Sequence, residues 1–454
     1  MQRVASTRCH PPSPTRREET SIMKKPSIPN PSALTRTGAT SRFIRNAAAW
    51  SLAAASALSG ANAWAQQIVR IAQLEPLSGP FQSQGETNVH TLQAAVDEFN
   101  AHNKDIQFEI SVFDAQGKAQ EALNIFRQAT ERGIQYFTGG GSSAIVSGLI
   151  EAVNTYNERN PGREVLYLNH QAIDPDFTES RCSFWHFRFD PHVHMRMFAL
   201  TSYITRDAAV KKVYLINQDY SFGQQVEASA KRYLGSMRPD IAIVGEERHP
   251  IGRTKDFAPY VAKIRATGAD TVITGNFGQD LVLLIKAAKD AGLNVKFYTY
   301  YGNALGAPTA VGAAGVDRLR LVGTWETNAM SPRMKAIHDG FKAKYPKTDI
   351  FHSGVIEVVG LMGDAVRKAG SVEPKRVAFA LEGLKTQGAF GEVEMRAGDH
   401  QLLAPLFIQT FEPVDGKKVK HGIEGLPLGF RTDAKIAATE TAPVMACQMK
   451  RPSR

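Results

Sequence analysis

Residues 139–144 place two hydroxyl side chains where a short apolar run gives way to a helical pattern. The segment reads Gly-Gly-Gly-Ser-Ser-Ala. Free backbone N–H groups at a helix N-terminus attract anions, and the hydroxyls of Ser142 and Ser143 add hydrogen-bonding capacity there. We therefore expect these serines to hold the anionic end of a ligand. Plain capping of the helix by Ser142 is compatible with this prediction and explains the same residues.

The same segment formally matches a relaxed dinucleotide-binding fingerprint, Gly139-x-Gly141-x-x-Ala144. Such a fingerprint normally follows the first strand of its domain, whereas this one follows the third predicted strand. We therefore expect no cofactor.

Aromatic side chains gather in loops that are predicted to follow strands. In an open parallel sheet, ligands bind beyond the carboxyl ends of the strands. A single ring in such a loop is more often part of the core, but several together favour a ligand cleft lined by rings. These loops contain Phe81, Tyr220, Phe222, Phe277, Tyr300, Tyr301 and Trp325, together with the polar residue Gln171.

Histidine and methionine side chains near position 190 could in principle bind a soft metal ion. His186, His192 and His194 lie near Met195 and Met197, but their spacing fits no zinc pattern. We expect packed or solvated histidines and no metal. The sequence after residue 65 also contains no nucleophile elbow, HExxH motif or Walker loop. We therefore expect a protein that is not an enzyme.

Two runs of alternating strand and helix patterns must position these residues. The first run has strands at 68–74, 106–113, 134–137 and 165–168, with helices at 86–100, 119–132 and 142–157. The second has strands at 213–216, 241–244, 271–273 and 295–300, with helices at 223–234, 257–266 and 280–291. Repeated strand–helix units predict an α/β fold of parallel sheets flanked by helices.

An extended aromatic segment, residues 184–191, separates the two runs. The simplest arrangement is two doubly wound lobes joined by a crossover there. Helices are predicted at 332–344, 353–368 and 374–384, and a final hairpin from 391–395 and 406–411 around a turn at 397–399. We expect residues 66–187 and 326–384 in lobe 1, 188–325 and 385–447 in lobe 2, and 448–454 as a tail.

The first 65 residues have the composition of a secretory signal. They hold nine basic and two acidic residues, and so most of the net charge of +10. The remaining charges are interspersed, which argues against nucleic-acid binding. An apolar stretch at 47–58 precedes Ala63-Trp64-Ala65, which predicts cleavage after Ala65. A buried alanine-rich helix is the alternative, and the true start is Met1 or Met23.

The cysteines indicate the compartment. No cysteine stands at the cleavage site, so we expect a soluble periplasmic protein without lipid. Cys9 lies in the removed segment, which leaves Cys182 and Cys447 in the mature chain. Two thiols in an oxidising compartment usually pair, and we expect a disulfide between them.

These motifs together carry a resemblance. From about Ile68 to Met449 the chain resembles the extracytoplasmic solute-binding proteins of branched-chain amino-acid ABC importers, the leucine/isoleucine/valine-binding protein family. The marks are residues 71–80, Gly85, residues 114–117, 139–143 and 219–223, the run 257–292 with its turn at 268–270, and Gly391.

The resemblance implies a type I periplasmic-binding fold, in which two lobes on a multi-strand hinge close around a small molecule. It implies a monomer that delivers its ligand to a membrane permease with ATPase subunits. The ligand would be a branched-chain or other amino acid, or a related small carboxylate, amide or aromatic acid. An exported enzyme and a ligand-sensing signalling receptor on the same scaffold are the alternatives.

The resemblance also implies roles for particular residues. A serine of the 142–143 pair would hold the ligand carboxylate, and Phe222 and Phe277 would cover the ligand from the second lobe. Tyr301 stands where amino-acid receptors carry the glutamate that pairs with the ligand ammonium, and Asp280 or Glu326 could replace that glutamate. The predicted ligand-binding residues are Phe81, Ser142, Ser143, Gln171, Ala172, Tyr220, Phe222, Phe277, Asp280, Tyr301 and Trp325.

Overall fold

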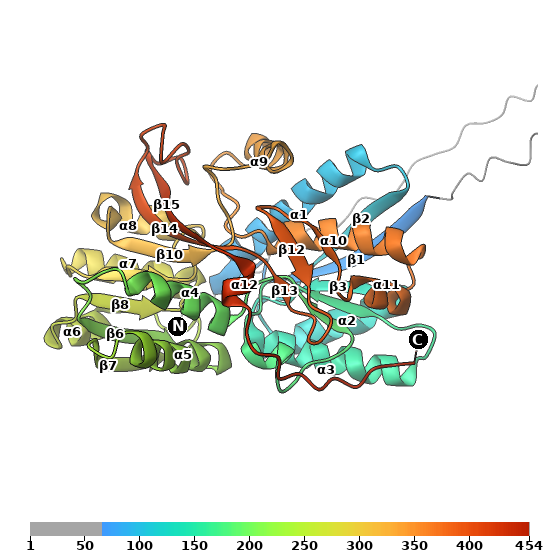
Figure 1. Cartoon of the computed structure of the whole chain (residues 1–454), viewed down its shortest axis with the longest axis horizontal. Helices are drawn as coiled ribbons and strands as arrows, with labels where there is room; N and C mark the ends of the chain where they lie inside the picture. Colours follow the sequence, from blue (N-terminus) through green and yellow to red (C-terminus); the bar gives the residue numbers. More distant parts are fainter. Residues whose placement is uncertain (1–65, 454) are drawn as a thin grey trace, which may run out of the picture. The chain divides into compact units, whose positions relative to one another are not determined.

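The computed structural model describes residues 66–453, which belong to one compact unit of the chain (Figure 1). The predicted secretory signal and its cleavage after Ala65 lie outside the described residues. Among residues 66–453, no helix combines the length and the apolar character needed to cross a membrane.

The first lobe is built on a five-stranded parallel sheet in the order β2-β1-β3-β4-β5. Its strands are β1 Gln67–Glu75, β2 Ile106–Asp114, β3 Tyr136–Gly139, β4 Leu166–Asn169 and β5 His186–Arg188. The helices that follow the first three strands are α1 Gln82–His102, α2 Ala119–Glu131 and α3 Ser143–Arg159. The alternation predicted for residues 68–168 is confirmed.

Helices cover both faces of this sheet because its strands are apolar on both sides. One core cluster contains side chains of α1 with α9 (Pro332–Lys344), α10 (Gly354–Ala369) and α11 (Pro374–Leu381). A second cluster joins the opposite face to α2 and α3. Figure 1 shows α1 and α10 on one side of β1 and β3, and α2 and α3 on the other.

The second lobe is built on a seven-stranded sheet in the order β15-β14-β10-β9-β8-β6-β7. Its strands are β6 Lys212–Gln218, β7 Ala242–His249, β8 Thr271–Thr274, β9 Lys296–Thr299, β10 Leu319–Gly323, β14 Leu406–Pro413 and β15 Leu428–Ile436. Strands β6 to β10 run parallel to one another. At the β10 edge of this group, β14 pairs antiparallel with β10, and β15 pairs antiparallel with β14. Its helices are α4 Val193–Ile204, α5 Ser221–Met237, α6 Ala258–Ala266, α7 Gly278–Asp290, α8 Ala307–Val311 and α12 Ala438–Thr441.

The predicted final hairpin is wrong. Strand β12 (Glu392–Met395) pairs with β11 (Lys385–Gln387) and β13 (Leu402–Leu403), whereas β14 pairs with β10 and β15. The apolar residues of β12 and β13 pack in the first-lobe cluster, although we expected residues 385–447 in the second lobe. The Arg188 N–H also donates to the His400 carbonyl. Strand pairing is non-local, so alternating apolar residues predict a strand without predicting its partner.

The chain crosses between the lobes four times, and a disulfide fastens the last crossing to the first lobe. The chain passes between the lobes after β5, after β10 and between β13 and β14. After β15 it leaves α12 and runs toward the first lobe, as Figure 1 shows, where Cys447 bonds to Cys182. The predicted disulfide is confirmed, and it closes a sequence separation of 265 residues.

Candidate ligand-binding site

A small pocket lies between the two lobes at the carboxyl ends of their strands. The space between its lining atoms is about 240 Å³, which includes the part that opens to solvent. The first lobe contributes loops after β3 and β4, and the second lobe contributes loops after β6, β8 and β9. The eleven lining residues are Gln84, Gly141, Ser142, Ser143, Gln171, Ala172, Ile173, Tyr220, Phe222, Phe277 and Tyr301.

The N-terminus of α3 supplies the polar end of the pocket. Ser142 is the N-cap residue, yet its hydroxyl makes no capping hydrogen bond, which leaves this group available to a ligand. Ser143 is the first residue of the helix and is buried. The turn before them needs glycine, because Gly139 has φ of +99° and a Cβ there would lie 2.0 Å from the Leu74 carbonyl oxygen.

Four aromatic rings of the second lobe form the opposite wall. The Phe277 ring centroid lies 5.8 Å from that of Tyr301 and 6.2 Å from that of Phe222. Tyr220 lies beside Phe222 at 5.8 Å. Burial raises the pKa of Tyr220 and the pKa of Tyr301 well above their usual value, so both hydroxyls stay neutral near pH 7. The wall therefore offers apolar surface and uncharged hydroxyl groups.

The pocket carries no formal charge of its own. None of its eleven lining residues, all within the described chain, is an acid, lysine, arginine or histidine. Both polar atoms of the Gln171 amide are used, since Nε2 donates to Glu75 (3.2 Å) and Oε1 accepts from Asn88 (2.7 Å). The buried carboxylate of Glu75 is in turn 3.1 Å from the His170 ring. Its charge is thus held by an internal polar network rather than offered to a ligand.

A buried ion pair stands behind the ring wall. The Arg196 guanidinium donates two hydrogen bonds to Asp190, of 2.6 and 2.8 Å, and lies 5.8 Å from the Tyr301 ring centroid. Both side chains are almost fully buried. The positive charge of Arg196 behind the ring wall does not favour a cationic group in the pocket.

Eight of the predicted ligand-binding residues line the pocket, and three do not. Trp325 packs in the first-lobe core, 5.2 Å from the Phe390 ring. Asp280 accepts hydrogen bonds from Gln218 Nε2 (2.7 Å) and the Gly252 N–H (2.8 Å). Phe81 contacts Phe277 outside the pocket. Position after a strand fixes which loop a residue occupies, but packing decides where its side chain points.

Gln84 is the main lining residue that the sequence analysis left out. It lies in the first turn of α1, and its Oε1 is buried without a hydrogen-bond partner. An unpaired buried amide oxygen is unfavourable. Gln84 therefore has an acceptor free for a ligand, and its place shortly after the first predicted strand is the only sequence signal of this role.

The histidines near position 190 lie with Glu179, but their hydrogen bonds do not suit a metal. Glu179 Oε1 lies 3.1 Å from His194 Nδ1 and 4.0 Å from His192 Nε2. Burial lowers the pKa of His192 far below its usual value, so its ring is neutral. Since its Nδ1 accepts the His194 N–H, the ring proton lies on Nε2, which then has no lone pair for a metal.

Comparisons with known proteins agree with this architecture. Residues 68–418 match the family described as periplasmic binding protein. The chain is 33% identical over 419 residues to Leu/Ile/Val-binding protein homolog 4 of Brucella abortus, covering 88% of this chain and 97% of that protein. A solved structure from Brucella ovis, a leucine-, isoleucine-, valine-, threonine- and alanine-binding protein in a closed conformation, is 30% identical with a TM-score of 0.76. The match covers 85% of this chain and 100% of the chain in that structure.

A more distant structure shares the fold. The solute-binding protein of an ABC transporter from Rhodopseudomonas palustris, solved with p-hydroxybenzoic acid, is 18% identical with a TM-score of 0.70. The match covers 82% of this chain and 98% of that one. With two α/β lobes, a pocket between them and these relatives, the chain belongs to the periplasmic binding proteins of the leucine/isoleucine/valine-binding type, the solute-binding components of ABC transporters.

Proposed function

We propose that the protein binds a small carboxylate whose body carries no positive charge. The observation that carries the proposal is a pocket with two serines at the N-terminus of α3, of which Ser142 makes no capping hydrogen bond, with four aromatic rings opposite and no acidic lining residue. Ser142 and Ser143 would hold the carboxylate, and Tyr220, Phe222, Phe277 and Tyr301 would cover an apolar or planar body. The unpaired Gln84 Oε1 would meet a remaining polar group of the ligand.

A branched-chain amino acid is the second candidate, because the relatives that are 30–33% identical are named for such ligands. An amino acid would bring an ammonium group into a buried site whose lining offers no carboxylate. Burying a charge without a partner is unfavourable by several kcal/mol. This argument favours a carboxylate without an amino group, such as the p-hydroxybenzoic acid bound by the distant relative.

Calorimetric titration with three probes tests the proposal: 4-hydroxybenzoate, leucine, and 4-methylpentanoate, which is leucine without its amino group. We expect measurable binding of at least one of the two acids and weaker binding of leucine. Ser143→Ala should cost about 1.5–3 kcal/mol, roughly ten- to a hundredfold in affinity, because a hydroxyl paired with a charged group is lost.

Position 301 gives the sharper comparison. Tyr301→Glu supplies the missing carboxylate and should improve leucine binding, whereas Tyr301→Gln, which has similar size but no charge, should not. Tight leucine binding by the wild type, unimproved by Tyr301→Glu, would show that Tyr301 does not set the specificity.

We propose that the receptor acts as a monomer in the periplasm, without catalysing a reaction on its ligand. It would close its lobes, 66–187 with 326–384 and 188–325 with most of 385–447, and pass the ligand to a permease and its ATPase subunits. Because a ligand shifts a hinge equilibrium only by its differential affinity, contacts from both lobes to one molecule suit this role. Substrate turnover or docking to a sensor protein would instead support the enzyme or signalling alternatives.

We also propose export by a cleavable signal, with a mature N-terminus at Gln66 and no lipid. N-terminal sequencing and intact-mass measurement of a periplasmic extract test this. A chain that still begins at Met1 or Met23 in that fraction contradicts the cleavage site.

A further inference from the structure

Phe81 belongs to the first lobe, and its side chain reaches into the second. It ends the short helix η1 (Gly79–Phe81), which precedes α1, and its side chain packs against the second-lobe core cluster. Its ring centroid lies 4.9 Å from that of Phe277, with the planes 33° apart. Two aromatic rings this close attract each other in addition to the apolar area that they bury. A first-lobe residue thus has its main aromatic contact in the second lobe.

Two glycines of the second lobe make room for this ring. A Cβ on Gly278 would lie 2.6 Å from Phe81 Cδ1, and a Cβ on Gly252 would lie 3.2 Å from Phe81 Cε2. Both glycines have positive φ, +57° and +65°. They come from different loops, the one after β7 and the one after β8. Together with Phe277 they form a socket, which we call the Phe81 socket.

Asp280 holds the two halves of the socket together. Its Oδ2 accepts from the Gly252 N–H (2.8 Å), which fixes the loop after β7 to the first turn of α7. The same oxygen accepts from Gln218 Nε2 (2.7 Å) at the end of β6. Asp280 is almost fully buried, so these bonds stand in a site from which water is largely excluded. The acid that we expected to touch the ligand is placed to organise the surface that receives Phe81.

Phe277 belongs both to the socket and to the ligand pocket. It lines the pocket beside Tyr301, and it also contacts Phe81. Withdrawing Phe81 would remove the packing that supports Phe277 from the first lobe. Lobe closure and the shape of the ligand-binding wall therefore depend on one shared side chain.

We propose that Phe81 is a positioning residue that latches the two lobes together and keeps a closed form populated before ligand arrives. The consequence for binding follows from mass action, since the apparent affinity equals the intrinsic affinity multiplied by the fraction of protein that is in the binding-competent form. The effect on affinity rests on the proposed function, because it takes the pocket beside Phe277 as the ligand site. The effect of Phe81 on lobe closure in the ligand-free protein does not rest on the proposed function.

The test compares Phe81→Ala with Phe198→Ala as the control. Phe198 is half-buried on α4 and pairs with Tyr233, 5.8 Å away, within the second lobe. Distances between spin labels on the exposed positions Gln120 and Lys255, one in each lobe, report closure. We expect Phe81→Ala to lengthen these distances without ligand and to weaken binding of 4-hydroxybenzoate or leucine about tenfold, while Phe198→Ala matches the wild type in both measurements.

A double-mutant cycle separates the latch from a general loss of packing. Gly278→Ala should open the lobes because its Cβ collides with the ring, and combining it with Phe81→Ala should add little further opening. Additive effects would overturn the proposal. Unchanged ligand-free distances in Phe81→Ala would also overturn it, even if affinity falls. If neither 4-hydroxybenzoate nor 4-methylpentanoate binds the wild type, the proposed ligand class fails, and the ligand-free distances still decide the latch.

Discussion

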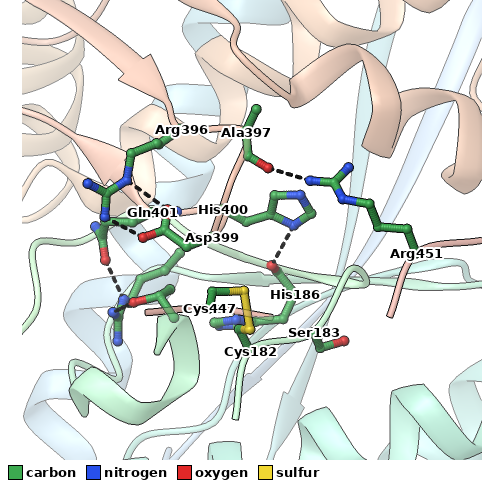
Figure 2. The surroundings of a disulfide bond; sticks show 12 residues. Cys182, Ser183, His186, Arg396, Ala397, Asp399, His400, Gln401, Cys447 and Arg451 are labelled. Atoms are coloured by element: carbon green, nitrogen blue, oxygen red, sulfur yellow. Dashed lines mark hydrogen bonds and ion pairs between the residues drawn. A yellow bond between two sulfur atoms is a disulfide. The ribbon is translucent and has the colours of Figure 1, made fainter. Parts of the chain in front are cut away.

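Replacing Cys447 by serine removes the disulfide that ties the C-terminal segment to the first lobe. The bond joins Cys182, in the loop before β5, to a segment that has come from β15 and α12 of the second lobe. Figure 2 shows its surroundings, where Arg451 donates to the Ala397 carbonyl and the Arg396–Asp399 ion pair lies close by. The variant tests how far this link stabilises the folded protein.

The size of the effect follows from the length of the closed loop. With a sequence separation of 265 residues, the chain-entropy model gives about 5–6 kcal/mol at 25 °C. This is an upper figure, because residual structure in the unfolded chain lowers it. The segment around the bond also has weak contacts of its own, since Val444 is 91% and Met445 56% exposed. Once released it can fray and regain entropy, so we expect a loss of about 2–4 kcal/mol.

Urea unfolding of wild type, Cys447→Ser and Cys182→Ser measures the difference. Each single variant, the double variant and reduced wild type should lose the same free energy of unfolding, because all four lack the same bond. Equal stability of wild type and the double variant would refute the reasoning. Titration of two free thiols in denatured, unreduced wild type would refute the pairing itself.

Three further predictions concern the stability of the fold. Burial raises the pKa of Glu357 from 4.5 to about 7, so the wild type should lose about 3 kcal/mol of stability as pH rises from 4.5 to 7, because the folded state holds the proton more tightly. Glu357→Gln should remove that slope in denaturation measured at several pH values. Asp190→Asn leaves the buried Arg196 charge without its ionic partner and should lower the free energy of unfolding by about 3–5 kcal/mol. A loss below about 1 kcal/mol would mean that water reaches the ion pair. Gly139→Ala should destabilise by about 2–5 kcal/mol through collision and strain. Gly133→Ala, with similar φ but open space, should cost about 1 kcal/mol, and equal losses at both glycines would disprove the collision.

Local periodicity predicted most helices and strands. The helix at 332–344 matches α9 at both ends, and the helices at 119–132 and 353–368 differ from α2 and α10 by one residue at each affected end. In α2 and α9 the buried residues recur at helical spacing on one face, and that pattern depends only on neighbouring residues.

The helix α4 escaped prediction for the opposite reason. Val193, Met195, Met197 and Leu200 are all buried, and so is Arg196. A helix covered on most sides has no polar face, so its sequence shows no clear period. Strand β15 was also missed, because its central residues alternate poorly between buried and exposed positions.

The sequence by itself determined the two series of strand–helix units, the family, the cysteine pair and the place of Ser142 and Ser143 at a helix N-terminus. These features depend on residue types and short spacings along the chain. Tertiary structure alone decided that Trp325 faces the core, that Asp280 binds Gly252, and that Phe81 reaches the other lobe. The physical reason is that a side chain's direction is set by the space left between packed elements, and these contacts join residues that lie far apart in the sequence.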